Sequence, residues 1–145
     1  MKFIFKITEV NKELLIKYPY AALDGQLTIL LKDVIFFDEE YVSLLGLAIP
    51  IAGWLKGIEA NHLTDFDYSS DEYQENPVLH LARIEGYSYA ITSSWVKAPT
   101  DNILTLREIS YCFNSFLQEL NTAVQQEYGV AFSDMRILSE VFKKW

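Results

Sequence analysis

The chain has 145 residues, of which half are apolar and 14% are aromatic, and its formal net charge is −8. This length predicts a single domain over residues 1–145, and the supply of apolar side chains excludes a disordered chain. The acidic balance disfavours binding to nucleic acid or to anionic membranes and favours basic partners. Cys112 is the one cysteine, which excludes an internal disulfide and is typical of a reducing compartment, so we expect a cytoplasmic protein.

The first ten residues alternate in polarity, which predicts a β-strand. Phe3, Phe5 and Ile7 fall on one side of this strand, and lysines fall on the other. This is the half-buried pattern of an antiparallel sheet. The alternation also distinguishes the segment from a signal peptide, which needs a continuous apolar run.

Residues 26–37 are the longest strand candidate, and a shorter strand is predicted at residues 14–16. The dipeptide Asp24-Gly25 is typical of a tight turn and would begin the long strand. Both faces of residues 26–37 carry apolar side chains. We therefore expect this strand to lie at the centre of a sheet, with a helix covering one face.

The first predicted helix covers Glu39–Ile58, where apolar residues recur at helical spacing. Asp38 would cap its N-terminus, and Pro50 inside it predicts a kink. Residues 41–55 carry no charge, but fifteen helical residues rise only ~22 Å against a hydrocarbon core of ~30 Å. The sequence therefore favours a buried core helix over a membrane span.

The second predicted helix covers Ile103–Tyr128 and ends at Gly129, a residue that favours a left-handed stop. Before it, two strands are predicted to form a hairpin with a two-residue turn at Glu85-Gly86. Together these patterns predict an α+β domain in which one antiparallel sheet of about five to six strands packs against two main helices.

Residues 65–75 hold five of the eight excess negative charges and contain no lysine or arginine. The acids in this segment are Asp65, Asp67, Asp71, Glu72 and Glu75, and they alternate with Tyr68 and Tyr73. Tyrosines anchor many protein interfaces, and acids around them steer a basic partner. We expect these seven residues to form a partner-binding surface. Two other interpretations stay open, a solvated loop without a binding role and a strand whose Tyr68 packs inward.

Metal or catalytic motifs are not found in the sequence. The two histidines and Cys112 lack the spacing of a zinc site. A calcium loop that starts at Asp65 would need glycine and glutamate where Ser70 and Asn76 stand. We expect no catalytic residue, no bound metal and no cofactor.

A different class of function stays open at this stage. A small enzyme or a metal-binding protein would use Asp65, Asp67 and Asp71 together with His80. A third interpretation is an adaptor whose acidic face binds a basic protein.

The segment around the acids and the predicted hairpin also resembles a known group. The residues that carry the resemblance are Phe66, Tyr68, Ser70, Asp71, Glu75-Asn76-Pro77-Val78-Leu79, Ser93 and Trp95. They resemble small bacterial proteins that look like immunity proteins of contact-dependent and Rhs/Wap-type toxin systems, over about residues 24–120. The resemblance implies a non-catalytic protein that neutralises a cognate toxin domain, a basic nuclease, by occluding its active site. It brings no binding residues with it.

Overall fold

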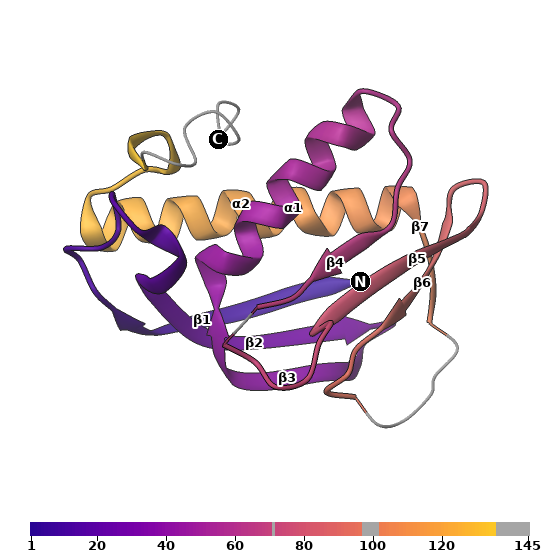
Figure 1. Cartoon of the computed structure of the whole chain (residues 1–145), viewed down its shortest axis with the longest axis horizontal. Coiled ribbons are helices and arrows are strands. Elements are labelled where there is room, and N and C mark those ends of the chain that lie inside the picture. Colours follow the sequence, from indigo (N-terminus) through magenta and orange to yellow (C-terminus); the bar gives the residue numbers. More distant parts are fainter. Residues whose placement is uncertain (71, 97–101, 136–145) are drawn as a thin grey trace.

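The computed structural model describes residues 1–70, 72–96 and 102–135, which form two helices and two antiparallel sheets (Figure 1). The first sheet has the order β1-β2-β3, with β1 (Lys2–Val10), β2 (Leu23–Leu31) and β3 (Val34–Ser43). The second has the order β4-β5-β6-β7, with β4 (Phe66–Tyr68), β5 (Leu79–Glu85), β6 (Ser88–Thr92) and β7 (Ile103–Thr105). The helices are α1 (Leu44–Glu59) and α2 (Leu106–Tyr128), and short 3-10 turns lie at η1 (Pro19–Ala21) and η2 (Phe132–Asp134).

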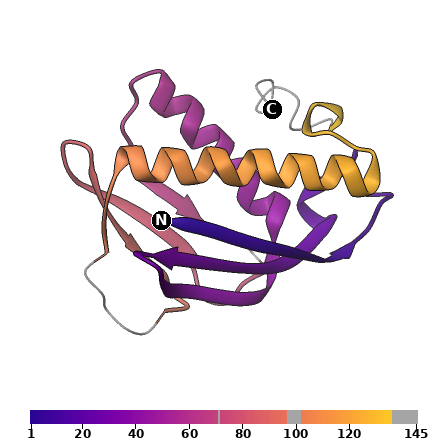
Figure 2. The same cartoon turned by 180° about the vertical axis from the view of Figure 1, so that it is seen from behind.

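The α+β class and the two helices are confirmed, but the prediction of one sheet of five to six strands is wrong. The reason lies in the connection after β3. That strand leads directly into α1, and the chain returns from α1 at β4, which pairs with β5 and not with the first sheet. Figures 1 and 2 show both helices on the same side of the two sheets.

The predicted strand over residues 26–37 is in fact a hairpin of β2 and β3. Lys32 and Asp33 take φ values of 49° and 64°, and Leu31 pairs with Val34 across them. Positive φ at both central residues is the geometry that matches the twist of a two-residue hairpin turn. The predicted strand at residues 14–16 is also wrong, since these residues lie in the turn between β1 and η1.

Gly25 lies inside β2, so the tight turn predicted at Asp24-Gly25 is wrong. It pairs with Ile7 of β1 and Val42 of β3. The backbone of β1 approaches closely here and leaves no room for a side chain at this position. A glycine is required by this close approach and not by a turn.

The first helix begins five residues later than predicted, because residues 39–43 stay in β3. Asp38 accepts hydrogen bonds from Gln26 Nε2 and Thr28 Oγ1, both at 3.0 Å, so it belongs to the sheet and does not cap a helix. Ser43 is the N-cap, and its hydroxyl accepts from the Gly46 amide at 3.2 Å. No helix among the described residues is long and apolar enough to cross a membrane.

The second helix begins at Leu106, because residues 103–105 form β7 beside β6. Thr105 and Glu108 form a capping box, and Gly129 ends the helix with a φ of 69°, which confirms the predicted stop.

The hairpin of β5 and β6 is confirmed, but its register differs from the prediction. Glu85 pairs with Ser88, so the turn residues are Gly86 and Tyr87, and a bulge precedes them.

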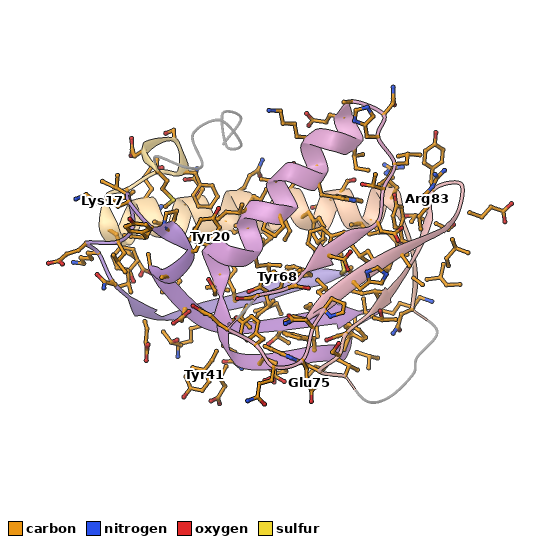
Figure 3. The ribbon with its side chains drawn as sticks, viewed as in Figure 1. Lys17, Tyr20, Tyr41, Tyr68, Glu75 and Arg83 are labelled. Carbon is orange, nitrogen blue, oxygen red and sulfur yellow. The ribbon has the colours of Figure 1, made fainter. Side chains whose placement is uncertain are left out.

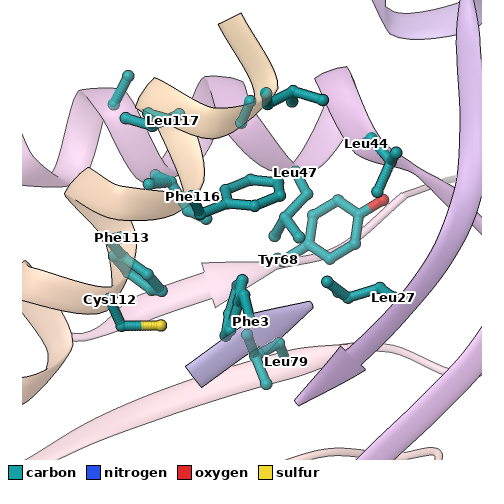
Figure 4. Close-up of a cluster of buried hydrophobic side chains, with 14 of the residues drawn as sticks. Phe3, Leu27, Leu44, Leu47, Tyr68, Leu79, Cys112, Phe113, Phe116 and Leu117 are labelled. Atoms are coloured by element: carbon teal, nitrogen blue, oxygen red, sulfur yellow. The ribbon is translucent and has the colours of Figure 1, made fainter. Parts of the chain in front are cut away.

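The core lies between the helices and the sheets (Figure 4). Phe3 of β1 packs edge-on against Phe113 and Phe116 of α2, with ring centroids 5.7 and 5.5 Å apart. Cys112 is buried beside them, and burial raises the pKa of its thiol to about 12. This cysteine therefore packs as a small apolar residue and stays protonated at neutral pH.

Replacing Gly25 by alanine tests the close approach of β1 and β2. The new Cβ would lie 2.4 Å from the Lys6 carbonyl oxygen and 2.6 Å from Leu44 Cδ1. We expect the free energy of unfolding, measured in urea, to fall by about 3 kcal/mol. Gly53→Ala is the control, because nothing lies within 4 Å of its Cβ, and this helical position should gain about 0.5–1 kcal/mol. Equal effects of the two variants would contradict this strand pairing.

The capping box predicts a dependence of stability on pH. The Thr105 amide and hydroxyl donate to Glu108 Oε2 at 2.7 and 2.9 Å and lower the pKa of this carboxyl group. A lowered folded-state pKa stabilises the fold above the unfolded pKa, and this stability is lost as the pH falls through the folded value. Glu108→Ala should cost about 0.5 kcal/mol at neutral pH, since the group is exposed, and progressively less below about pH 4. Urea unfolding of both proteins across this range, with Glu119→Ala as control, measures it. A difference in unfolding free energy between wild type and Glu108→Ala that did not change with pH would contradict the role of the capping box.

Candidate functional site

The acidic segment, residues 65–75, lies over β4 and the loop that follows it. Asp65 precedes β4, Asp67 and Tyr68 belong to it, and Glu72, Tyr73 and Glu75 lie in the loop. Asp71 lies outside the described residues. The carboxylates of Asp65, Asp67, Glu72 and Glu75 are all on exposed residues, so the segment presents negative charge to solvent.

The two tyrosines of the acidic segment point inward and support it. Tyr68 is 3% exposed, and burial raises the pKa of its phenol above the ordinary value. Its hydroxyl lies 3.3 Å from the Tyr73 hydroxyl, which accepts a hydrogen bond from the Ser43 amide at 3.2 Å. Tyr68 therefore follows the inward-packing interpretation, and Tyr73 is half-buried behind the loop.

Asn76 fixes the shape of the loop through hydrogen bonds to its backbone. The Ser70 amide donates to Asn76 Oδ1 at 3.1 Å, and Asn76 Nδ2 donates to the carbonyl oxygens of Ser70 and Tyr73, each at 3.0 Å. One amide side chain thereby satisfies three backbone groups, which is how asparagine stabilises turns.

Trp95 anchors the C-terminal part of the loop to the first sheet. Its indole stacks on Phe37 of β3 with ring centroids 5.6 Å apart, and it meets Tyr73 edge-on at 4.9 Å. The indole Nε1 also donates to the Glu75 carbonyl oxygen at 3.2 Å. The loop is therefore held by neutral contacts, and its carboxylates are left to face outward.

Two of the acids have partners on β5. Asp67 Oδ1 lies 2.5 Å from His80 Nδ1, and Asp65 Oδ1 accepts a hydrogen bond from the Arg83 amide at 2.8 Å. The structure therefore brings together Asp67 and His80, as the metal or enzyme interpretation requires. Among the described residues, however, no group of three His, Cys, Asp or Glu side chains could hold a metal ion.

A cleft of about 280 Å³ opens between the acidic segment, η1 and the start of α1. Its lining residues are Tyr20, Ser43, Gly46, Pro50, Asp67, Tyr68, Ser69, Ser70 and Glu72. Figure 3 shows Tyr20 and Tyr68 beside one another across the N-terminal end of α1. The volume is at or below the lower limit of ~300 Å³ for drug-sized pockets, so the cleft fits a side chain better than a cofactor.

The electrostatics of the cleft favour a cation. Asp67 and Glu72 line it, and Asp24 lies close enough for repulsion from Glu72 to act on it. Burial, together with repulsion from Glu9 and Glu72, raises the pKa of Asp24. A lysine or arginine side chain in the cleft would meet two carboxylates, and the exposed ring of Tyr20 would offer a cation–π contact.

Sequence reasoning missed the residues on the other side of the cleft. Tyr20 comes from η1, Ser43 from the end of β3, and Gly46 and Pro50 from the first half of α1. None of them carries charge or belongs to a motif, so only the fold brings them beside the acidic segment. The weak signal that the sequence offers for this side of the cleft is Tyr20, a tyrosine that follows a proline in a connecting segment.

Replacing Asn76 by alanine should loosen the loop without unfolding the protein. Three hydrogen bonds to the backbone of Ser70 and Tyr73 would be lost, so we expect faster amide hydrogen exchange at Ser70 and a loss of about 1–2 kcal/mol of stability. Gln74→Ala, at an exposed position of the same loop, is the matched control and should change neither quantity. Unaltered exchange at Ser70 would show that Asn76 does not hold the loop.

Comparison with known proteins identifies a family. No curated protein and no solved structure matches the chain. A family model described as "Domain of unknown function (DUF7878)" matches residues 3–126. This stretch includes α1, the seven described strands except the first residue of β1, and α2 as far as Gln126. It also includes the acidic segment and all residues that line the cleft. The chain therefore belongs to the DUF7878 family.

Proposed function

We propose that this protein is a non-catalytic immunity protein that binds a basic toxin domain of bacterial origin and occludes its active site. It acts in the cytoplasm, and its partner is a cognate protein toxin domain, not a nucleic acid or a membrane. The proposal extends the resemblance seen around residues 66–95. The physical observation that carries it is the acidic cleft, with Asp67 and Glu72 in its lining and Glu75 nearby in the same loop.

The arrangement suits recognition of a protein better than catalysis. The loop that carries Glu72 and Glu75 is held by neutral hydrogen bonds and ring contacts. The two carboxylates could therefore bind a partner without disturbing the structure of the loop. Within the described part of the chain, no hydrogen bond or ion pair is made by the carboxylates of Glu72 and Glu75. A basic partner would relieve the repulsion between such acids and would associate faster because of it.

Tyr20 extends this surface beyond the residues expected from the sequence. Its side chain is 46% exposed and lines the cleft. Tyrosine supplies a large contact area with few rotatable bonds, which suits the centre of an interface. We therefore place Tyr20 in the contact surface, while Tyr68 and Tyr73 support it from inside.

One observation favours a second candidate, an enzyme or a metal-binding protein that uses Asp67 and His80. A carboxylate bonded to a histidine ring nitrogen orients the ring for base catalysis or for metal binding. Metal analysis of the purified protein tests this candidate directly. A stoichiometric metal that is lost in Asp67→Asn would favour it over the immunity function.

The immunity function is tested by co-expression with the toxin domain encoded beside the gene. We expect the toxin domain alone to stop bacterial growth and the pair to restore it, with a stable complex in gel filtration. An unrelated toxin domain of the same charge is the specificity control, and its growth arrest should persist when this protein is co-expressed with it. Growth arrest that persists despite equal expression of both proteins would overturn the proposal. A stable complex with a basic protein that is not toxic would instead favour the adaptor interpretation.

Neutralising Glu72 and Glu75 should slow association with that toxin domain. For Glu72→Gln combined with Glu75→Gln, we expect an association rate lower by roughly fivefold at low salt, and a weaker dependence on salt, because both acids steer the partner. Surface plasmon resonance at two salt concentrations measures both effects.

The matched control is Glu85→Gln combined with Glu119→Gln, which removes the same charge from exposed positions on β5 and α2. These substitutions should leave the association rate nearly unchanged. Equal slowing by both pairs would assign the effect to net charge and would move the binding surface away from the cleft.

A further inference from the structure

β3 forms an open edge of the first sheet. Among the described residues, β2 is the one strand that pairs with it. Figures 1 and 2 show β3 at the margin of the molecule, below the helices. Apart from Ser43 at its end, no backbone group of β3 bonds outside the first sheet in the described chain. β3 therefore presents an open strand edge to solvent.

Large apolar side chains lie exposed along this edge. Val34 is 66% exposed, Ile35 is 62% exposed and Tyr41 is 72% exposed. Proteins commonly protect an edge strand with lysine, proline or bulges. Neither lysine nor proline occurs between positions 33 and 43, and β3 relies on its two bulges. The exposed side chains are those that pair favourably with a strand added beside them.

The charges on the edge select among the strands that could be added. Asp33, Asp38, Glu39 and Glu40 lie within residues 33–43, and no lysine or arginine accompanies them. A second copy paired through β3 would place these acids close to one another, which destabilises cross-strand pairs. A strand with lysine or arginine at alternate positions would instead place opposite charges across the pair. These charges would therefore disfavour a second copy and favour a basic strand.

The bulges of β3 limit how long the added strand can be. Its register against β2 shifts twice, once beside Phe36 and once beside Glu40 and Tyr41. Between these shifts, Phe37, Asp38 and Glu39 pair in sequence with Ile29, Thr28 and Leu27. Because bulges bend and twist a strand, an added segment would be short and centred on residues 37–39.

We propose that β3 binds a short, extended, lysine- or arginine-rich segment of a partner protein as an additional strand of the first sheet. The main-chain hydrogen bonds provide affinity, and the acids provide selection for a basic sequence. This surface is separate from the cleft, whose lining residues include only Ser43 of β3. The proposal therefore goes beyond the immunity function and does not depend on it.

A blocked peptide of alternating lysine and valine is the probe that tests this proposal. NMR of the isotope-labelled protein measures its binding and the hydrogen exchange of each amide. We expect the peptide to slow exchange at those β3 amides near residues 37–39 that do not bond to β2. The same peptide with every second amide N-methylated keeps its charge but cannot pair as a strand, and we expect it to lose this protection.

Charge reversal at Glu39 and Glu40 to lysine should weaken peptide binding by about fivefold. The two residues face opposite sides of the sheet, so one favourable pair with the lysine face of the peptide becomes repulsive. Glu85→Lys combined with Glu119→Lys is the control, with the same charge change at exposed positions on β5 and α2, and it should change binding much less. Circular dichroism confirms that both variants fold.

Three results would overturn the proposal. The first is equal binding of the N-methylated peptide, which would show electrostatic adsorption without strand pairing. The second is equal weakening by the two charge reversals, which would show dependence on net charge alone. The third is protection of β3 amides by the protein's own self-association, which would assign this edge to a second copy.

Discussion

Trp54 of α1 lies edge-on against three aromatic rings, and the relative placement of α1, α2 and the second sheet depends on these contacts. Its ring centroid is 6.2 Å from that of Phe66 on β4, 5.9 Å from that of Tyr89 on β6 and 5.6 Å from that of Phe113 on α2. The indole Nε1 donates to the Thr64 carbonyl oxygen at 3.0 Å. This bond fixes where the chain enters β4, so the acidic segment begins at a set position beside α1.

In the loop beside the cleft, neutral side chains maintain the backbone structure and charged side chains face the solvent. Asn76 and Trp95 hold the loop with hydrogen bonds and ring contacts that salt does not screen. The carboxylates of Glu72 and Glu75 face outward, where water solvates them and reduces their mutual repulsion. A loop whose shape relied on ion pairs would lose that shape when a basic partner competed for the acids. A loop held by neutral contacts would keep its shape in that situation, which suits a surface that binds charge.

Strong local patterns were sufficient to predict some elements, and long-range contacts decided the others. The alternation of β1, the apolar stripe of α2 and its stop at Gly129 are local features, and the structure has them. The turn at Lys32 and Asp33 carries no glycine or asparagine, so its positive φ values left no sequence signal. The acids at positions 38–40 resemble the first turn of a helix, but pairing with β2 outweighs that preference. The acidic side of the cleft was visible as a charge run, whereas the opposite side, contributed by η1 and α1, could not be found without the fold.

Ser43 connects the cleft to the open edge of β3. It is 7% exposed, and each of its polar atoms has a partner. Its amide donates to the Tyr73 hydroxyl, its carbonyl oxygen accepts weakly from the Tyr68 hydroxyl at 3.5 Å, and its side chain donates to the Tyr20 carbonyl oxygen at 2.7 Å. The same residue ends β3 and caps α1. A buried polar residue with all its groups satisfied can adopt few alternative positions. Ser43 therefore holds the end of the strand edge, the start of the helix, the two tyrosines of the cleft and Tyr73 behind them in one fixed geometry. A partner would meet both surfaces already formed.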